Sequence, residues 1–196
     1  MRVAINGFGR IGRSVFRLLN KQKDISVVAI NDIADNEAMV YLLKYDTVMG
    51  PFKDSVSLSE NVLKTSNNEV KLISERKISN LPWTVQGVDV VIESTGLFKT
   101  RQQLNEHLSS GAKKVILTVP AKDEIDFTVV LGVNDQHLNA DHKIISNASC
   151  TTNCLAPMAK ILNDSFGIEY GLINTIHAYT NDQRLADVPH LSLIHI

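Results

Sequence analysis

The stretch VAINGFGRIGRSVFRLL, residues 3–19, decides the fold. A short apolar run is followed by the pattern Gly-x-Gly-x-x-Gly at Gly7, Gly9 and Gly12, and apolar residues at helical spacing then continue to Leu19. Three glycines by themselves can also form an ordinary tight turn. Between a strand and a helix, however, they let backbone N–H groups and the positive end of the helix dipole face a pyrophosphate. The stretch therefore predicts a strand–turn–helix unit that binds a dinucleotide.

The next predicted strand carries a second dinucleotide signal. The β-branched run Ile25–Ile30 ends at Asn31-Asp32, and Asp32 lies 20 residues after Gly12. That is the spacing of the acidic residue that binds the adenosine ribose hydroxyls. A carboxylate at this position would repel a 2′-phosphate, so NAD is favoured over NADP. The alternative role for Asp32 is a cap at the end of the strand.

Strands alternate with helices along much of the remaining chain. This alternation favours a Rossmann-type, doubly wound parallel sheet with helices as crossovers. The expected strands are residues 70–73, 88–92, 115–119 and 128–131, and the expected helices are residues 37–45 and 101–108, the second closed by Gly111.

Composition and charge exclude several classes of protein. With 44% hydrophobic and 21% charged residues, the chain has the composition of a soluble protein that buries a core. A formal net charge of -1 gives no attraction to nucleic acid or to an anionic membrane. No run of about 18 apolar residues occurs, and the early glycines interrupt any signal-peptide core. Two cysteines are too few to staple the fold, so we expect a cytoplasmic location.

The two cysteines lie together in NASCTTNCLAP, residues 147–157. An apolar run ends just before this stretch, and residues 151–163 have helical periodicity, which places Cys150 at a strand-to-helix turn. The helix dipole and free N–H groups there would lower the pKa of a thiol and hold a developing oxyanion. We therefore expect Cys150 to be a nucleophile. Cys154 is expected to be a small buried core residue one turn further along.

Other readings of the cysteine pair are weaker. Two thiolates without nearby His or Asp ligands make a poor zinc site, so no metal is expected. A disulfide between Cys150 and Cys154 would join residues on one helical turn and is not expected in the resting protein. Oxidative bridging of the two thiols stays open as an alternative.

Several segments together resemble one enzyme family. They are AINGFGRIGR, LLKYDTVMGPF, LPW, ESTGLF, GAKKVILTVPAK, SNASCTTNCLAP and TIHAYTNDQRLADVPH, in this order. From Met1 to about His190 they resemble the phosphorylating glyceraldehyde-3-phosphate dehydrogenases, and the SCTTN core is a highly specific motif. Erythrose-4-phosphate dehydrogenases share the nucleophile segment but depart from the pattern at residues 177–184, so they rank second.

The resemblance implies a mechanism and its residues. Cys150 would attack the aldehyde to give a thiohemiacetal, and His177 would be the base that pairs with the thiol. An isolated histidine in an apolar run is more often a core residue, and only the pairing with Cys150 raises His177 above that. The implied substrates are glyceraldehyde 3-phosphate and inorganic phosphate. NAD is the implied cofactor, and the implied assembly is a homotetramer.

Further site residues follow from the same resemblance. Ser149 and Thr151 match the site of the attacking phosphate, and Thr180 matches a residue that binds the substrate's own phosphate. Val188-Pro189, together with Asp32, supports NAD over NADP. The implied cofactor contacts are Gly7, Gly9, Arg10, Ile11, Gly12, Asp32, Arg76 and Thr118.

The expected domain division follows the motifs. Residues 1–149 would form the NAD-binding domain, and residues 150–190 would be the incomplete start of a truncated α+β catalytic domain, with Ile168–Tyr179 as its first strand. The tail LSLIHI, residues 191–196, does not match the family. We therefore expect the fragment itself to lack activity, as an NAD-binding module with a reactive thiol. A redox-sensing role for Cys150 is the further alternative.

Overall fold

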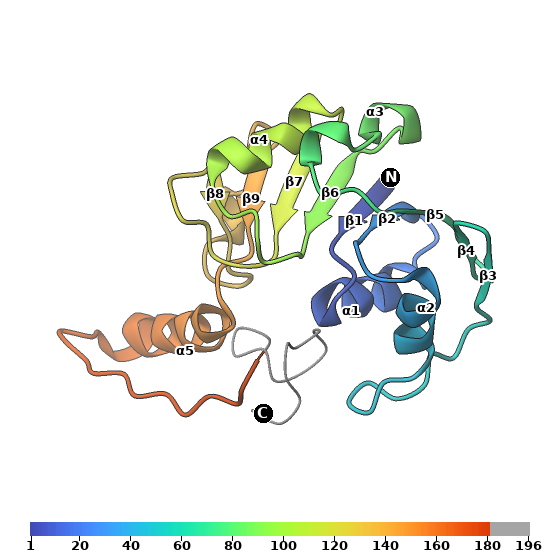
Figure 1. Ribbon diagram of the computed structural model, residues 1–196. Coiled ribbons are helices and arrows are strands. Elements are labelled where there is room, and N and C mark those ends of the chain that lie inside the picture. Colours follow the sequence, from blue (N-terminus) through green and yellow to red (C-terminus); the bar gives the residue numbers. More distant parts are fainter. Residues whose placement is uncertain (181–196) are drawn as a thin grey trace, which may run out of the picture.

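The predicted strand–turn–helix unit is present at the start of the chain. The computed structural model describes residues 1–180 and shows strand β1 (Arg2–Asn6) running through the glycine turn into helix α1 (Arg10–Leu19) (Figure 1). Gly7 has a φ of 92°, a left-handed conformation that favours glycine. The expectations placed on Val188, Pro189, and the tail at residues 191–196 fall outside the described residues.

Nine strands of the described residues form one sheet in the order β3-β4-β5-β2-β1-β6-β7-β9-β8. All neighbouring strands from β5 to β8 in that order pair in parallel, and only the β3–β4 and β4–β5 pairs are antiparallel. The remaining strands are β2 (Ser26–Asn31), β3 (Ser57–Ser59), β4 (Val62–Lys64), β5 (Glu69–Ile73), β6 (Val90–Glu93), β7 (Lys114–Leu117), β8 (Phe127–Thr128) and β9 (Ile144–Ser146).

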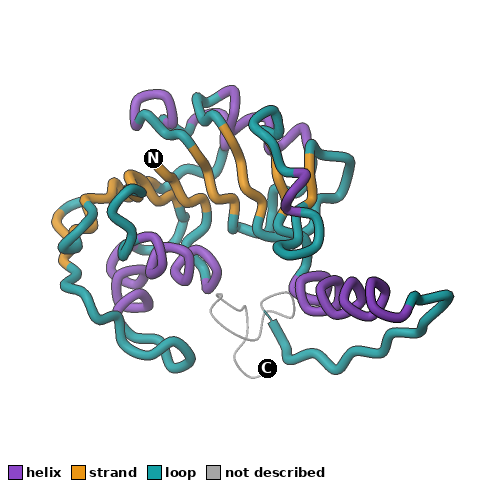
Figure 2. Tube along the Cα trace, turned by 180° about the vertical axis from the view of Figure 1, so that it is seen from behind, coloured by secondary structure: helices purple, strands orange, loops and turns teal. Residues whose placement is uncertain are grey.

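Helices cover both faces of the sheet, as Figures 1 and 2 show from opposite sides. The remaining helices are α2 (Asn36–Lys44), α3 (Trp83–Gln86), α4 (Arg101–Ser109) and α5 (Cys150–Phe166), with short 3-10 turns at Ile78–Asn80 and Asp135–His137. The expected doubly wound, mostly parallel sheet is therefore confirmed. None of the helices in residues 1–180 is long and apolar enough to cross a membrane.

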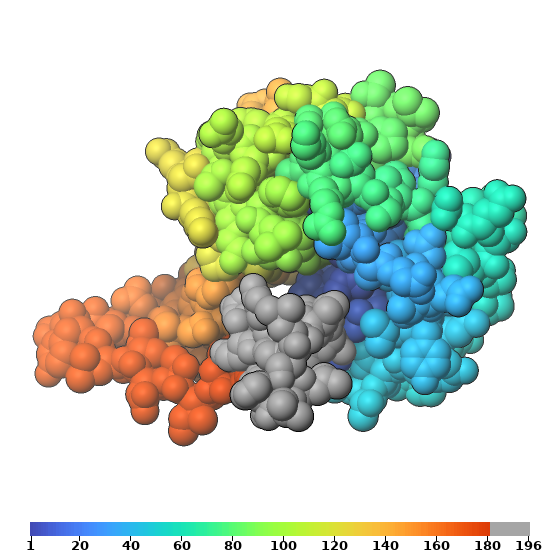
Figure 3. All heavy atoms as spheres, in the orientation of Figure 1, coloured from blue at the N-terminus to red at the C-terminus, as the bar shows by residue number. Residues whose placement is uncertain are grey.

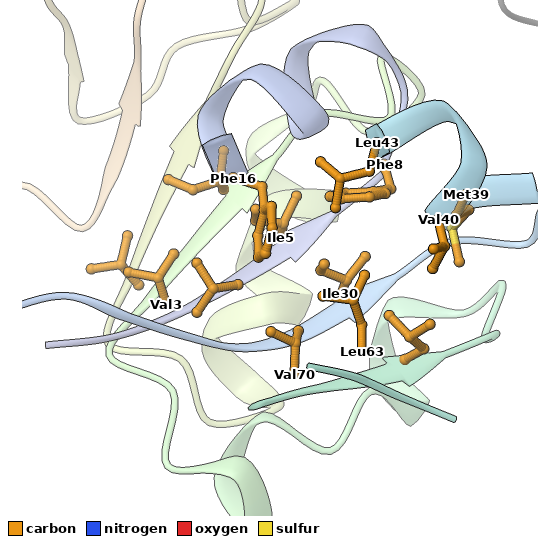
Figure 4. Close-up of a cluster of buried hydrophobic side chains, with 14 residues drawn as sticks. Val3, Ile5, Phe8, Phe16, Ile30, Met39, Val40, Leu43, Leu63 and Val70 are labelled. Atoms are coloured by element: carbon orange, nitrogen blue, oxygen red, sulfur yellow. The ribbon is translucent and has the colours of Figure 1, made fainter. Parts of the chain in front are cut away.

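Alternating side chains of the strands build a core on each face. Val3 and Ile5 of β1 pack with Phe16 of α1 and Leu43 of α2 on one face (Figure 4). Ala4, between them in the sequence, points to the other face, where it packs in a cluster with Trp83. A third cluster lies under α4 around Leu104. This two-sided burial explains why the central strands have nearly continuous apolar sequences.

The strand order reverses beside β1. The chain passes from β1 through α1 to β2 on one side, whereas β6 lies against β1 on the other side and leads through α4 to β7. In such sheets ligands bind in the crevice outside the carboxyl ends of the strands at this reversal. The glycine turn after β1 and the loop after β6, Ser94–Gly96, therefore flank the expected ligand crevice.

Helix α5 and the segment after it differ from the rest of the molecule. In the space-filling view the residues from about 150 to 180 project to one side of the sheet (Figure 3). The expectation that Ile168–Tyr179 is a strand is wrong, because these residues pair with no strand of the described chain. A single extended segment without a ladder partner does not satisfy its backbone groups as a strand does.

Candidate active site

Cys150 is the first residue of helix α5, immediately after a tight turn that follows β9. The helix is capped by Ser149, whose hydroxyl oxygen accepts a hydrogen bond of 2.9 Å from the backbone N–H of Thr152. Ala148, just before the cap, is buried and has a φ of 57°, which is uncommon for a residue with a Cβ. The predicted strand-to-helix position of Cys150 is thus what the structure shows.

Two polar side chains hold this turn in place. The Ser146 hydroxyl donates to the Val119 carbonyl (2.8 Å) and accepts from the backbone N–H of Ala148 (3.0 Å). The Asn153 side-chain amide donates to the carbonyls of Asn147 (2.7 Å) and Ser149 (2.9 Å). These bonds connect the end of the sheet to the first turn of α5, so the start of the helix has a defined direction.

The structure brings Cys150 and His177 together although 27 residues separate them. The Sγ atom lies 3.2 Å from Nε2 of the imidazole, and Nδ1 lies 2.5 Å from the Ala178 carbonyl oxygen. Because a carbonyl oxygen only accepts, Nδ1 carries a proton and Nε2 faces the sulfur. His177 lies in an exposed segment without helix or strand, so the contact with Cys150 and not a core position defines its surroundings.

Each member of the pair shifts the pKa of the other. The hydrogen bond from His177 is the main cause that lowers the pKa of the Cys150 thiol, with a smaller contribution from the Thr151 backbone N–H at the helix start. The pKa of His177 is raised, first by its hydrogen bond to the Ala178 carbonyl and then by Cys150. Both shifts favour a thiolate beside an imidazolium, which is the reactive form of a cysteine nucleophile.

The expectation that Cys154 is buried is wrong. Cys150 and Cys154 are both free and exposed, and α5 contains no buried residue. The helical spacing of apolar residues on α5 predicted a buried face, but Met158, Ile161 and Leu162 are all more than half exposed. Within residues 1–180 no group of three or more His, Cys, Asp and Glu side chains could hold a metal ion.

Of the three expected phosphate-binding residues, two adjoin Cys150 in the chain and the third follows His177. Thr151 is in the first turn of α5, and Thr180 is exposed three residues beyond His177. Ser149 and Thr152 border a hollow of about 340 Å³ whose other walls come from residues 120–128 and Ala148. The Ser149 hydroxyl is also the helix cap, so any ligand contact there would share that oxygen.

The glycine turn has the geometry of a dinucleotide cradle. A Cβ atom on Gly12 would lie 2.1 Å from the Gly7 carbonyl oxygen, and one on Gly7 would lie 2.6 Å from the Thr95 nitrogen. By contrast, a Cβ on Gly9 would meet no protein atom within 4 Å, so the backbone is open to a ligand there. Close packing at two glycines and open space at the third fit a bound pyrophosphate.

The other expected cofactor residues gather at the same edge of the sheet. Asp32 follows β2, Arg76 lies just beyond β5, and Thr118 follows β7, so all three lie at carboxyl ends of strands. Asp32 accepts hydrogen bonds from the backbone N–H groups of Phe8 (2.6 Å) and Ala34 (3.0 Å), which join it to the glycine turn. Arg10 and Ile11 open helix α1 beside that turn, and both side chains are accessible to solvent.

Sequence reasoning missed a buried polar cluster beneath this crevice. Glu93 and His107 are fully buried, and Thr95 forms hydrogen bonds to Glu93 in the loop after β6. The available signal was the acidic residue at the end of the apolar run VVIE, residues 90–93, directly before a Ser-Thr-Gly loop. A carboxylate that ends a buried strand needs partners, and these could not be identified without the fold.

Comparison with known proteins agrees with this geometry. Sequence models for glyceraldehyde 3-phosphate dehydrogenase match twice, the NAD binding domain over residues 1–101 and the C-terminal domain over residues 149–194. The chain is 53% identical over 195 residues to glyceraldehyde-3-phosphate dehydrogenase of Streptomyces coelicolor, and 54% identical over 198 residues to that of Borreliella burgdorferi. It is 53% identical over 194 residues to that of Thermotoga maritima.

These alignments cover 98% of this chain but 58% of each relative, so the chain spans somewhat more than half the length of these relatives. The match to the NAD binding domain includes the glycine turn, Asp32 and Arg76, and the match to the C-terminal domain includes the helix that begins at Cys150. The chain therefore belongs to the glyceraldehyde 3-phosphate dehydrogenase family.

Proposed function

We propose that this chain provides the cofactor domain and the nucleophile of an NAD-dependent, phosphorylating aldehyde dehydrogenase. The proposed reaction converts glyceraldehyde 3-phosphate and inorganic phosphate to 1,3-bisphosphoglycerate. The observation that carries the proposal is the 3.2 Å contact between Cys150 Sγ and His177 Nε2 at the start of α5. A thiol activated in this way, attached to a dinucleotide-binding domain, suits the oxidation of an aldehyde through a thioester.

The chemistry begins at the sulfur. The Cys150 thiolate attacks the aldehyde carbon, a C–S bond forms, and the developing alkoxide takes a proton from the His177 imidazolium. The positive end of the α5 helix dipole is suited to stabilise that oxygen. His177 Nε2 is then neutral and can accept the hydroxyl proton when the thiohemiacetal is oxidised. NAD, when bound, supplies the acceptor for the hydride that leaves the same carbon.

The second half of the reaction releases the cysteine. An oxygen of inorganic phosphate attacks the thioester carbonyl, the C–S bond breaks, and the thiolate departs beside His177. In the proposal, Ser149 and Thr151 bind this phosphate and Thr180 binds the phosphate of the substrate. Ser149 and Thr151 flank Cys150 in the sequence, and Thr180 lies three residues beyond His177, which supports the assignment.

The proposed cofactor contacts are the glycine turn with Arg10 and Ile11, Asp32, Arg76 and Thr118. The proposed domain division is 1–149 for the NAD domain and 150–190 for the start of the catalytic domain. The last strand of the sheet ends at Ser146 and α5 begins at Cys150, which supports this boundary. A homotetramer in the cytoplasm is the assembly and location proposed for the full-length protein.

NADH formation tests the proposed reaction. Full-length protein is incubated with NAD, inorganic phosphate and glyceraldehyde 3-phosphate, and absorbance of NADH is followed. We expect turnover that requires phosphate and that exceeds the rate with erythrose 4-phosphate. Absence of NADH formation would contradict the proposal. A higher kcat/KM for erythrose 4-phosphate would instead favour an erythrose-4-phosphate dehydrogenase.

The second candidate function is redox sensing by Cys150. It is favoured by one observation, namely that the thiol with the lowered pKa is exposed. Peroxide titration of the 196-residue chain, read by mass spectrometry at Cys150 and Cys154, tests it. Selective, fast oxidation of Cys150 supports sensing, and equal slow oxidation of both thiols contradicts it.

A further inference from the structure

A row of buried polar side chains lies at the strand ends where the dinucleotide is expected to bind. Asn31, Asn6 and Glu93 are the last residues of β2, β1 and β6, and they are directly paired in the strand register. Their exposed fractions are 5%, 0% and 0%. The Asn31 amide donates to Asn6 Oδ1 (2.7 Å), and the Asn6 amide donates to Glu93 Oε2 (2.5 Å). The row thus lies under the strand reversal where a ligand is expected.

Glu93 is the centre of this row. Its Oε2 lies 2.5 Å from the Asn6 amide nitrogen and 3.0 Å from His107 Nε2, and its Oε1 accepts from the Thr95 N–H (2.9 Å) and hydroxyl (2.5 Å). Four donors therefore converge on one carboxylate. Both carboxylate oxygens are fully used within the protein, so the side chain does not serve as a direct ligand.

The partner His107 is itself oriented by another buried residue. Trp83 Nε1, which can only donate, lies 2.9 Å from His107 Nδ1, so Nδ1 is the acceptor nitrogen of the ring. The imidazole is then neutral, and its proton is on Nε2, directed at Glu93. Trp83 and His107 are both 0% exposed. The Glu93 carboxylate is consequently stabilised by hydrogen-bond dipoles and not by a cation.

The cluster connects the loops on both sides of the crevice. The Ser94 hydroxyl donates to the Gly7 carbonyl (2.7 Å), and the glycine turn is in close contact with Thr95. On the other side, Asn31 exchanges hydrogen bonds of 2.9 Å with the backbone of Glu75, the residue before Arg76. The row therefore links the glycine turn, the loop after β6 and the loop that carries Arg76.

A purely structural role is a poor explanation for this arrangement. A buried carboxylate that lacks a cation is expensive to desolvate, and an apolar side chain of similar size would stabilise a strand end at least as well. The carboxylate instead fixes the relative positions of two loops. It binds the Thr95 N–H and hydroxyl in the loop after β6, and it binds Asn6 at the end of β1, the strand that leads into the glycine turn. We propose that Glu93 is a positioning residue for dinucleotide binding, acting through Thr95 and Asn6 on the two loops that flank the crevice.

This inference rests on the proposed function in one respect, since NAD is taken as the ligand. The test measures the dissociation constant of NAD by calorimetry, together with the melting temperature and amide hydrogen exchange of residues 94–98 without ligand. The variants are Glu93→Gln, Thr95→Val and Thr95→Ser. Thr95→Val removes the hydroxyl, and with it the bond to Glu93 and the bond from the Leu97 N–H (3.1 Å), whereas Thr95→Ser retains both. The matched control is Asn68→Ala, because Asn68 is a buried amide that binds the Val27 N–H near the opposite end of the sheet.

We expect Glu93→Gln to weaken NAD binding about tenfold and Thr95→Val several-fold, with faster exchange in residues 94–98. The dissociation constant of NAD for Thr95→Ser should lie within about twofold of that of the original chain. Asn68→Ala should lower the melting temperature without weakening NAD binding. Unchanged affinity in Thr95→Val, or an equal loss in Asn68→Ala, overturns the inference even where Glu93→Gln fails to fold. If the original chain binds no NAD, the proposed function is contradicted instead. The inference is then decided by hydrogen exchange alone: unchanged exchange of residues 94–98 in Glu93→Gln and Thr95→Val would overturn it.

Discussion

Two helices of this molecule begin beside functional turns, yet they have opposite surroundings. Helix α1 follows the glycine turn, and its Phe16 is fully buried against the sheet and against Phe8, with ring centroids 5.8 Å apart. Helix α5 follows the cysteine turn, and its Leu162 is 51% exposed. The dinucleotide half thus has a packed core on each face of its sheet, whereas the helix that carries the nucleophile has no buried residue.

This contrast shows which part of the proposed site is supported by the packed sheet domain. The expected cofactor residues lie at the carboxyl ends of buried strands or in the first turn of α1, which supports the binding of the ligand by this half as a unit. The cysteine and the histidine meet at 3.2 Å, but His177 comes from an exposed segment that no strand supports. We infer that nucleotide binding belongs to the sheet domain, whereas the Cys150–His177 pair comes from a helix without buried residues and an exposed segment.

The largest expected effect is on the cysteine turn. Cys150→Ser in the full-length protein should lower kcat by at least about 10³-fold, because a hydroxyl is a far weaker nucleophile than a thiolate. NAD affinity should be unchanged, since the sheet domain is intact. The control is Cys154→Ser, which changes an exposed thiol one helical turn away and should retain most of the activity. Equal losses in both variants would mean that the two cysteines act together.

Stability should separate the two helices almost as sharply. Phe16→Ala removes a ring that is 0% exposed and should destabilise the chain by about 3–5 kcal/mol, from lost burial plus the cavity. Leu162→Ala on α5 should change the free energy of unfolding by less than about 0.5 kcal/mol. Urea unfolding followed by Trp83 fluorescence measures both, because Trp83 is the only tryptophan. A large effect of Leu162→Ala would show that α5 packs on something in solution.

The sequence predicted the sheet domain well for a physical reason. Strands such as β1 and β6 are buried on both faces, so they are continuous apolar runs, and the helices between them have a regular apolar spacing. The hairpin β3–β4 was missed because its strands, SLS and VLK, are too short to show a period. The same apolar spacing misled on α5, where it predicted a buried Cys154 although Cys154 is exposed and no residue of the helix is buried.

From the sequence, only those parts of the site could be predicted whose geometry depends on neighbouring residues in the chain. Gly7, Gly12 and Cys150 belong to short motifs whose geometry is set by the next few residues. The contact with His177 and the partners of Glu93 depend on tertiary structure, because the groups come from distant parts of the chain. For His177 the resemblance to the family supplied the pairing, and no periodicity or spacing would have done so.

The pH dependence of thiol alkylation tests whether His177 activates Cys150. Because His177 lowers the pKa of Cys150, the thiolate persists at pH values below those of an ordinary thiol, and is lost when the pH falls below the shifted pKa. In His177→Asn the alkylation profile should move to higher pH, and the rate with iodoacetamide near pH 7 should fall about tenfold. Mass spectrometry of the 196-residue chain measures this, with the exposed Cys154 thiol as an internal reference.

An unchanged profile in His177→Asn would show that the helix start alone activates the thiol. In that case the Thr151 backbone N–H, the next cause that lowers the pKa of Cys150, would be the main one. A matched control is His142→Asn, since His142 stacks on Phe127 at the start of β8 and precedes β9, whereas Cys150 follows the opposite end of β9. It should leave the alkylation rate at Cys150 unchanged.

The smallest expected effect concerns Ala148, at the junction between the two regions. Its left-handed φ of 57° costs about 1–2 kcal/mol relative to glycine, so Ala148→Gly relieves strain. Two losses oppose this gain. Glycine makes the unfolded chain more flexible by about 0.5–1 kcal/mol, and a buried methyl contributes about 0.8 kcal/mol. The terms nearly cancel, so the free energy of unfolding should change by less than about 0.5 kcal/mol in a urea titration.

A clear stabilisation of Ala148→Gly would mean that the turn before Cys150 stores strain that its neighbours do not offset. A clear loss would mean that the Ala148 methyl packs more tightly than its burial alone indicates. The change in the free energy of unfolding therefore reports how strained the backbone is between β9 and the helix that begins at Cys150. Near-neutrality is what we expect if Ser146 and Asn153, through their hydrogen bonds to the turn, already fix the backbone on both sides of Ala148.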